Sequence, residues 1–563
     1  MADNYDDYTR EQLLRLLRER DRRPRFGLVW ERDEIDHDLS VNNDFVALDW
    51  DAELSCGDPD GNRAQRNLII EGDNFDALRY LRMTHAGRVK CIYIDPPYNT
   101  GNRDFIYNDR FVDKEDNYRH SKWLEFMYRR LELAKELLTE DGVIFVSIDD
   151  NEVFHLGLLM EQVFGEANFV ACFLWRKVDS PNDNKVPITP DHEFVLCYAL
   201  TKDQARFTPL SAPSILDAYR VGEDGSRYRD RLLKKNGKNS LRRDRPTMFF
   251  PIIAPDGSEV LPIHDNGEEA RWAMGRDAVE KHRAAETLIW KQRKKLGKTG
   301  WEPYTREYPP ENPVRPYPSI WSDLPTMRQA KAMLRDIFDT SDLFSTPKPM
   351  ELIERILRMI DDPRAIVLDF FAGSGTTAQA VLNLNKEDGG NRSFILVSST
   401  EATADAPDKN LCRDVCAERV RRVIHGYTNK KGQPVEGLGG GFAYLRCRRI
   451  RAATVFRGIQ HAQVWTALQL IHDVPLLPYQ AALTMQTAEG KRGLVIYLPK
   501  LTEAAVEELQ RAIRASGQAV VYSWQPALLV QRLTDPRVAF EPIPAFLVNR
   551  FGGRAGGAMA GLR

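Results

Sequence analysis

The stretch Val89-Lys-Cys-Ile-Tyr-Ile-Asp-Pro-Pro-Tyr-Asn-Thr-Gly101 decides how the chain around it folds. Cys91 to Ile94 is a short apolar run of β-branched and aromatic side chains, which predicts a buried strand. The two prolines donate no ladder hydrogen bonds and hold the residue before them in extended geometry, so the strand ends at Asp95. We expect a stiff loop that presents the Asp95 carboxylate, backbone carbonyls and the Tyr98 ring at a carboxyl edge, where open α/β sheets bind ligands.

Those four residues alone also fit an ordinary proline turn, but a second, distant stretch favours a ligand site. It reads Ala365-Ile-Val-Leu-Asp-Phe-Phe-Ala-Gly-Ser-Gly-Thr-Thr377. Ile366 to Phe370 predicts a strand, Gly373 and Gly375 permit a tight turn with close backbone approach, and a helix follows. A helix N-terminus behind a glycine turn suits a nucleotide-like ligand. Alone this signal is weak, because Ala378 stands where the dinucleotide fingerprint has its third glycine.

Together the two stretches resemble the amino-methyltransferases of DNA, which use S-adenosylmethionine. Asp95-Pro-Pro-Tyr98 matches the Asp-Pro-Pro-Tyr motif of that family, and Phe371-Ala-Gly-Ser-Gly375 matches its Phe-x-Gly-x-Gly motif, in the order of the beta class. Ser345-Thr-Pro-Lys-Pro-Met-Glu-Leu-Ile353 looks like a further cofactor element of the family. The likeness covers residues 66 to 425 and is closest to modification subunits of type III restriction systems.

The resemblance implies a methyltransferase that uses S-adenosylmethionine to modify the N6 amine of adenine in duplex DNA, after the base has been flipped out. Aspartate rather than serine at position 95 favours adenine by family likeness. The implied catalytic residues are Asp95, Pro96, Pro97 and Tyr98. The implied cofactor-binding residues are Asp73, Asp95, Lys348, Pro349, Asp369, Phe371, Gly373, Ser374, Gly375, Thr376, Thr377 and Glu401.

Independently of this likeness, apolar runs alternate with helical patterns through residues 66 to 200. Strands are predicted at Leu68–Ile70, Val143–Ile148, Phe169–Trp175 and Glu193–Tyr198, with a long amphipathic helix at Tyr118–Leu138. This alternation predicts an α/β fold with a doubly wound, mostly parallel sheet. For the acids in Asp149-Asp-Asn-Glu152, we expect helix capping to be their role.

The composition divides the chain into five parts. We expect an N-terminal helix and arm at 1–65, the catalytic half of the methyltransferase core at 66–200 and a target-recognition insert at 201–340. The cofactor-binding half follows at 341–435, and after a glycine-rich linker a small α/β domain at 442–563 is predicted to bind a second copy or a partner. The glycine-rich tail from Gly552 is predicted to be disordered.

The insert is locally basic although the whole chain carries a net charge of −2. The stretch from Lys202 to Arg245 contains twelve Lys and Arg residues but only six Asp and Glu residues, and a second basic run follows Trp290. A charge run is usually a solvated face, but its place between the two motifs favours contact with DNA phosphates. The candidate DNA-binding residues are Lys234, Lys235, Lys238, Arg242, Arg243, Lys294 and Lys295.

The remaining composition excludes other classes of protein. Seven cysteines form no paired framework, and Cys412 and Cys416 lack the second pair of a zinc site, so we expect no metal. The acidic N-terminus has no apolar signal core and no run of about 18 apolar residues exists, which predicts a cytoplasmic protein without a membrane span. No G-x-x-x-x-G-K-[ST] sequence occurs, so ATP-driven restriction would need a separate subunit; we also expect a homodimer.

Several alternatives stay open at this point. An N4-cytosine methyltransferase would use the same pocket. A methyltransferase of RNA or of a protein glutamine would share the Pro-Pro-Tyr loop but would not need a long basic insert. A non-catalytic DNA-binding subunit of a defence complex is a further reading, although both motifs are intact. A dinucleotide oxidoreductase would leave the Asp-Pro-Pro-Tyr loop without a role.

Overall fold

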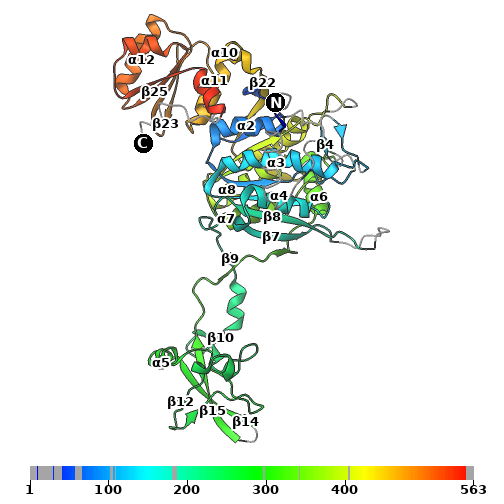
Figure 1. Cartoon of the computed structure of the whole chain (residues 1–563), viewed down its shortest axis with the longest axis vertical. Helices are drawn as coiled ribbons and strands as arrows, with labels where there is room; N and C mark the ends of the chain where they lie inside the picture. Colours follow the sequence, from blue (N-terminus) through cyan, green and yellow to red (C-terminus); the bar gives the residue numbers. More distant parts are fainter. Residues whose placement is uncertain are drawn as a thin grey trace. The chain divides into compact units, whose positions relative to one another are not determined.

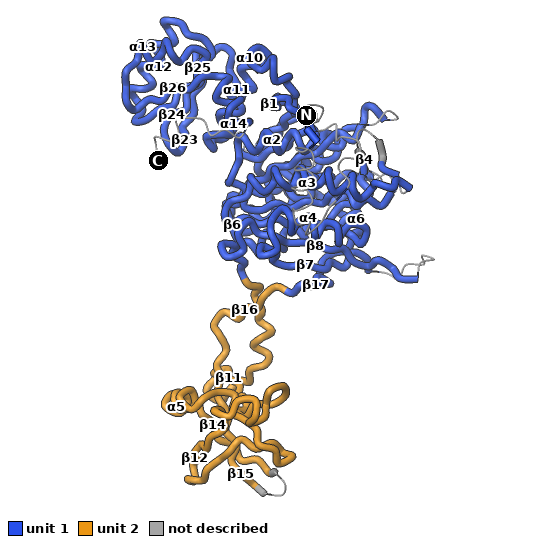
Figure 2. Tube along the Cα trace, viewed as in Figure 1, with its two compact units in different colours: residues 1–208, 318–563 blue, residues 209–317 orange. Residues whose placement is uncertain are grey.

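The structure, a computed structural model, describes residues 9–10, 30, 41–57, 66–101, 105–107, 110–113, 115–179, 187–295, 298–340, 343–402 and 406–552. The chain forms two compact units, shown in different colours in Figure 2. Unit 1 comprises residues 1–208 and 318–563, and unit 2 comprises residues 209–317. The predicted insert was 201–340, so its second boundary was placed too far along the chain. The reason is that the amphipathic helix α6 (Met327–Phe338) packs on α9 (Glu418–His425) of unit 1.

Unit 1 is built on a ten-stranded, mostly parallel sheet (Figure 1). The antiparallel pairings are β1 with β22, β6 with β8 and β7 with β8. This confirms the predicted doubly wound α/β architecture. In spatial order the strands are β1 (Phe45–Cys56), β22 (Phe442–Ile450), β2 (Leu68–Glu71), β19 (Ser393–Ser398), β18 (Ile366–Asp369), β3 (Val89–Ile94), β6 (Leu138–Ile148), β8 (His192–Ala199), β7 (Phe169–Arg176) and β17 (Ile320–Trp321).

Helices cover both faces of this sheet. Ile92 and Ile94 of β3 lie in one core cluster with side chains of α2 (Asn74–His85), α3 (Arg119–Leu137) and α4 (Val153–Phe164). Cys91 and Tyr93 point to the other face and are buried as well. The second helical layer contains α6, α7 (Met350–Ile360), α8 (Thr376–Asp388) and α9. Strands buried on both faces explain why the sequence shows continuous apolar runs there instead of alternation.

The two motif-bearing strands are neighbours. β18 pairs with β3 in parallel, with Val367 opposite Cys91 and Leu368 opposite Ile92. β18 leads into α8, in the layer of α7 and α9, whereas the chain after β3 leads to α3 in the opposite layer. The two carboxyl ends therefore lie side by side at a switch point, which is where doubly wound sheets bind ligands.

Two sequence-based boundaries are corrected at the sheet's far edge. β1 lies within 1–65, which was predicted to be an N-terminal helix and arm outside the core, yet it pairs with β22 from Phe45 opposite Ile450 to Asp51 opposite Tyr444. β22 in turn pairs with β2, so it belongs to the central sheet and not to the C-terminal domain. The pairing partner lies about 400 residues away in sequence, which no local pattern reveals. The predicted N-terminal helix lies outside the described residues.

The C-terminal region forms a small α/β layer, as predicted. Arg82 of α2 donates to the Phe551 carbonyl at 2.8 Å, and Arg88 donates to the Leu470 carbonyl at 2.7 Å, which ties this region to the core. Its elements are α10 (Val455–Gly458), α11 (His461–Ile471), β23 (Gln486–Gly490), β24 (Gly493–Leu498), α12 (Glu503–Ala515), β25 (Ala519–Ser523), α13 (Pro526–Arg532), β26 (Val538–Pro542) and α14 (Ala545–Phe551). Short hairpins in unit 1 are β4 (Ile106–Tyr107) with β5 (Arg110–Phe111), and β20 (Gly426–Thr428) with β21 (Pro434–Glu436).

Unit 2 has its own small core, formed by Leu233, Phe250, Ile252, Trp272 and Val279. Its main sheet has the order β10-β11-β15-β14. The elements are β9 (Leu210–Ser211), β10 (Arg220–Val221), β11 (Arg227–Leu232), β12 (Ile252–Ile253), β13 (Glu259–Val260), α5 (Arg276–Ala284), β14 (Leu288–Lys295), β15 (Lys298–Glu307) and β16 (Val314–Arg315). Across the described parts of both units, the helices are either too short or too polar to span a membrane.

Candidate functional site

The Asp95 loop leaves the carboxyl end of β3, whose six residues are all buried. Its backbone is held from α3, because the Trp123 indole donates to the Pro97 carbonyl at 2.7 Å. The loop is also closed on itself, since the Tyr98 hydroxyl donates to Asp95 Oδ1 at 2.8 Å. The predicted stiffness of this loop therefore has two sources besides the prolines.

Lys348 reaches this loop from the distant second half of the chain. Its ammonium lies 3.0 Å from Asp95 Oδ2, 3.1 Å from Glu193 Oε2 and 2.8 Å from the Tyr98 hydroxyl. Glu193, on β8, also lies 3.3 Å from the ammonium of Lys177. The structure places Lys348 against the Asp95 loop, and its assignment to cofactor binding stays a prediction.

Glu193 was not among the predicted site residues. Its carboxylate is 1% exposed and lies within 3.1 Å of the Tyr98 hydroxyl. The sequence did contain a sign of its role, since Glu193 is an acid at the second position of the apolar strand His192–Ala199. An ionised side chain inside a buried strand needs a partner, which points to a charged network there.

In this network the positive charges of Lys348 and Lys177 offset the negative charges of Asp95 and Glu193. Burial raises the pKa of Asp95, although the ammonium of Lys348 opposes that rise. Burial alone would also raise the pKa of Glu193, but Lys348 and Lys177 outweigh it and hold that pKa below its usual value. Burial would lower the pKa of Lys348, yet Asp95 and Glu193 hold it above its usual value. The ammonium therefore stays charged at neutral pH.

The glycine turn follows β18 as predicted. Gly373 and Gly375 have φ angles of 49° and 79°, in the left-handed region that favours glycine. Asp369 ends the strand, accepting from the Thr377 hydroxyl at 2.6 Å and from the Phe371 backbone N–H at 3.1 Å. Burial raises the pKa of Asp369 to about 7. Asp369 thus braces the turn from inside.

Two hydroxyls of the turn have a structural task. Arg419, 1% exposed, donates to Ser374 Oγ at 3.0 Å and to Thr376 Oγ1 at 2.7 Å. The side chains of Ser374 and Thr376 therefore satisfy a buried guanidinium, and the assignment of these two residues to cofactor binding stays a prediction. A Cβ atom added at Gly373 would lie 2.9 Å from Cζ of Phe344, so this ring covers the turn.

Asp73 and Glu401 follow the neighbouring strands β2 and β19. Asp73 caps α2, since its Oδ1 accepts from the Phe75 N–H at 2.9 Å, and its carboxylate remains 35% exposed. Glu401 pairs with Lys409 at 2.8 Å on the surface. Because β2 and β19 are parallel neighbours, both acids lie at the same sheet edge as the glycine turn. Pro349 is the N-cap residue of α7, directly after Lys348.

The predicted DNA-binding residues differ in exposure. Lys234 is 5% exposed and lies 3.5 Å from Glu302 and 3.6 Å from Asp265, so the structure corrects its assignment: its charge is paired inside unit 2 and does not face solvent. Arg242 pairs with Glu269 at 2.9 Å. Lys238, Arg243 and Lys294 are exposed and Lys235 is partly exposed. The side chain of Lys295 lies outside the described residues.

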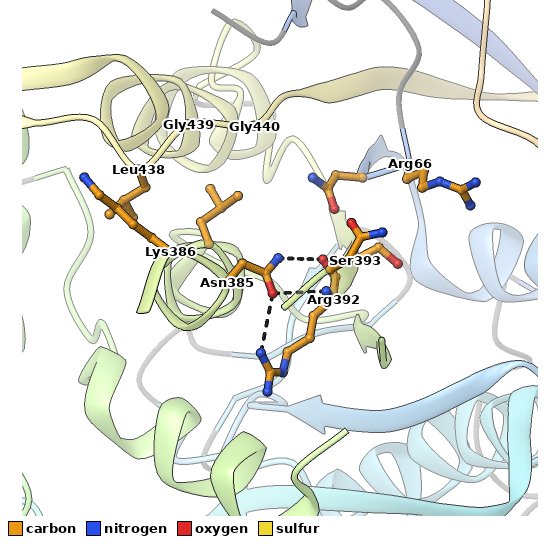
Figure 3. Close-up of a pocket in the computed structure, with 11 residues that line it drawn as sticks. Arg66, Asn385, Lys386, Arg392, Ser393, Leu438, Gly439 and Gly440 are labelled. Carbon is orange, nitrogen blue, oxygen red and sulfur yellow. Dashed lines mark hydrogen bonds between the residues drawn. The ribbon is translucent and has the colours of Figure 1, made fainter. Parts of the chain in front are cut away.

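A cavity of about 230 Å³ lies away from this chemistry (Figure 3). It is lined by Arg66, Asn385, Arg392 and Ser393 among others, and Asn385 hydrogen-bonds to Arg392 within it. Ser393 begins β19 and stands opposite Ile366, the first residue of β18. The cavity is therefore at the amino edge of the sheet, opposite the two motifs.

Asp369→Asn should change how stability depends on pH. The raised folded-state pKa means that the stabilising contribution of Asp369 is fully present below about pH 4 and is lost as the pH rises through about 7. We expect the free energy of unfolding of the variant to rise relative to that of the wild type by about 3 kcal/mol between pH 5 and 7, and the difference to stay constant at higher pH. Urea titrations at several pH values measure this, with the exposed Asp408→Asn as control. A difference that does not vary with pH would contradict it.

Lys348→Met should destabilise the protein. It leaves two buried carboxylates without their shared cation, and breaking such a pair costs about 3 to 5 kcal/mol. The loss should shrink as the pH falls, because protonation neutralises the acids. The double variant Lys348→Met/Glu193→Gln should recover part of the stability, whereas the surface variant Lys386→Met should unfold like the wild type. If the second substitution recovers nothing, the two groups are not coupled.

Comparisons with known proteins agree with this geometry. Residues 89–405 match the family model N6_N4_Mtase, described as DNA methylase. The chain is 34% identical over 414 residues to the type III restriction-modification enzyme StyLTI Mod subunit of Salmonella typhimurium, covering 68% of this chain and 61% of that one. It is 32% identical over 392 residues to the EcoPI Mod subunit of Escherichia phage P1, covering 60% and 58% of the two chains. It thus spans about three fifths of the length of these two relatives.

A third relative is covered more fully. The type II methyltransferase M.KpnI of Klebsiella pneumoniae is 34% identical over 346 residues, which cover 59% of this chain and 80% of that enzyme. The family match includes both motif strands, the Asp95 loop, Lys348 and the glycine turn. This chain belongs to the DNA methylase family.

Proposed function

We propose that this chain transfers a methyl group from S-adenosylmethionine to the N6 amine of adenine in duplex DNA. The observation that carries the proposal is the parallel pairing of β3 with β18, which brings the Asp95 loop beside the glycine turn. The first motif supplies hydrogen-bond acceptors for an amine, and the second supplies a turn that a ligand approaches closely. Neither motif does both tasks alone.

S-adenosylmethionine fits the residues at the turn. The ligand carries positive charge on its ammonium and sulfonium groups, and the acids Asp73 and Asp95 follow the strands β2 and β3 at this edge; Lys348 and Arg130 lie 3.0 and 3.4 Å from Asp95 and Asp73. Gly373 and Gly375, with Phe371, would hold the methionine part, while Asp369 and Thr377 brace the turn from inside. Asp73 and Glu401 are the candidates for the adenosine part. Bound there, the cofactor supplies an already activated methyl group, so the protein's task is positioning.

The Asp95 loop prepares the target amine. An amino group on a base is a poor nucleophile because its lone pair delocalises into the ring. Hydrogen bonds from its two N–H groups to Asp95 and to the Pro96 carbonyl would draw the lone pair out of the ring, and the carboxylate would stabilise the charge that develops on nitrogen. Each Asp95 oxygen accepts one bond at present, from Tyr98 or from Lys348, and has capacity for another. Tyr98 offers a ring on which a flipped base can stack.

Unit 2 is the candidate for sequence recognition. Its exposed cations, Lys238, Arg243 and Lys294, suit contacts with phosphates, which set position on a duplex without reading its sequence. By analogy with the Mod subunits, we propose that the chain acts in a restriction-modification system in the cytoplasm of a bacterium or archaeon. There it would form a homodimer and work beside a separate ATP-dependent restriction subunit.

The catalytic assignment predicts that Asp95→Ala loses methyl transfer. Because the variant removes the carboxylate that would accept the amine hydrogen, we expect kcat to fall by about 100-fold or more. Transfer of a radiolabelled methyl group to genomic DNA, followed by mass spectrometry of the nucleosides, measures the rate and identifies the product. N6-methyladenine supports the proposal, and N4-methylcytosine would assign the enzyme to the other target. Asp150→Ala, an exposed acid after the neighbouring strand, should behave as wild type.

The DNA-binding assignment predicts a change in salt dependence. Replacing Lys238, Arg243 and Lys294 by glutamine should weaken binding to duplexes of any sequence and lower the slope of log K against log salt by about 0.9 for each phosphate that is no longer neutralised. Fluorescence anisotropy at several salt concentrations measures both quantities. Lys234→Gln should instead reduce stability, because that side chain is buried. Unchanged affinity and slope in the triple variant would move DNA recognition to another surface.

A further inference from the structure

The acid Glu152 has no role in the site described so far. It occupies the N-cap position of α4, where the sequence predicted helix capping, but its side chain makes no cap hydrogen bond. Its carboxylate is 0% exposed, and no Lys or Arg forms an ion pair with it in the described part of the chain. A fully buried carboxylate is costly unless its oxygens are hydrogen-bonded, so its partners indicate its task.

One partner is Asn99, the residue directly after Tyr98. Asn99 has a φ of 57°, a left-handed conformation that asparagine tolerates better than most residues, and its side chain is 1% exposed. Its amide nitrogen donates to Glu152 Oε1 at 2.5 Å and to the Arg119 carbonyl at 3.2 Å. The strained end of the catalytic loop is thus fastened to the starts of α3 and α4.

Two histidines complete the set of donors around Glu152. Nδ1 of His120, on α3, lies 2.6 Å from Oε1, and Nδ1 of His155, on α4, lies 2.8 Å from Oε2. The Arg119 side chain donates to Nε2 of His120 at 3.1 Å. That bond places the proton of a neutral His120 on Nδ1, so the ring donates to the carboxylate. The short contact between His120 and Glu152 is therefore a hydrogen bond that the imidazole donates.

We propose that Glu152, held by His120 and His155, is a positioning residue for methyl transfer, which fixes Asn99 and through it the orientation of Asp95 and Tyr98. This rests on the proposed methyltransferase function. Asn99 is the next residue in the chain after Tyr98, and the Tyr98 hydroxyl donates a hydrogen bond to Asp95. Glu152 is therefore only one residue removed from the catalytic pair. Misplacing a reacting group by about 1 Å costs up to 100-fold in rate, so an anchor of this kind affects kcat more than binding.

The charges around Glu152 agree with this role. Burial raises its pKa to about 8, and burial lowers the pKa of both imidazoles. The other charged groups that act on it are Arg119 on α3, which favours the ionised form, and Asp149 on the loop before α4, which opposes it. Ionisation strengthens the bonds that Glu152 accepts, so the anchor should hold the loop better as the pH rises through about 8.

The test is a double-mutant cycle between Glu152 and Asn99. Glu152→Ala and Asn99→Ala should each lower kcat by about 10- to 100-fold, with KM for DNA and for S-adenosylmethionine within about two-fold of wild type. If Glu152 acts through Asn99, the double variant should be no worse than the more impaired single variant. Wild-type kcat in Glu152→Ala, or effects that multiply in the double variant, would overturn the proposal.

A conservative variant and a matched control separate positioning from folding. Glu152→Gln keeps an oxygen that accepts from Asn99, and His155 can change tautomer to accept from the new amide, so most of kcat should return. Its pH profile should lack the rise through about 8 that the wild type shows. Glu161→Ala, an exposed acid on the same helix, should match the wild type. If Glu152→Gln is as impaired as Glu152→Ala, or keeps the rise, the anchor is not the bond to Asn99.

Two readouts do not depend on activity. In a crystal structure of Glu152→Ala, Asn99 should leave the left-handed region and the Tyr98–Asp95 hydrogen bond should change; an unaltered loop would overturn the proposal even if methyl transfer is confirmed. Metal analysis of the purified wild type should find none bound stoichiometrically, and one equivalent of zinc held by these three side chains would replace the anchor with a metal site. A wild type that methylates no DNA would refute the proposed function, while the loop geometry would still decide the role of Glu152.

Discussion

The ammonium of Lys348 is the charge on which the site depends. It is 5% exposed and within 3.1 Å of two carboxylates, Asp95 and Glu193, and of the Tyr98 hydroxyl. Each of these buried acids would be costly without a nearby cation. Because Lys348 precedes α7, Asp95 and Tyr98 follow β3 and Glu193 lies on β8, one ion network joins segments that are about 250 residues apart.

The glycine turn and the Asp95 loop lie at the same sheet edge, and a different set of contacts holds each of them. The glycine turn is held by interior contacts, Asp369 with Thr377 and Arg419 with Ser374 and Thr376, and the ring of Phe344 lies against it at Gly373. The Asp95 loop is held by Trp123, Lys348 and Asn99, which leave the remaining acceptor capacity of Asp95 for a substrate. In both cases side chains that look functional by motif serve to fix the groups beside them.

In unit 2, some of the predicted DNA-binding cations are buried and others are exposed. Lys234 and Glu302 are buried together, while Lys238, Arg243 and Lys294 face solvent. A count of basic residues therefore overstates the surface available to phosphates. Since a phosphate contact requires an exposed cation, burial decides which members of a basic run can take part in DNA binding.

The sequence by itself determined the α/β class, the two motif loops and their glycine and proline geometry, because those depend on local dihedral preferences and on apolar runs. It also determined the family, through motifs that are short and contiguous. Only the tertiary structure decided that β1 and β22 join the central sheet, that Glu193 completes the Asp95 network, that Lys234 is buried and that Glu152 meets Asn99. Each of these is a pairing between residues far apart in the chain, and pairing depends on which strands become neighbours, a choice that no local pattern encodes.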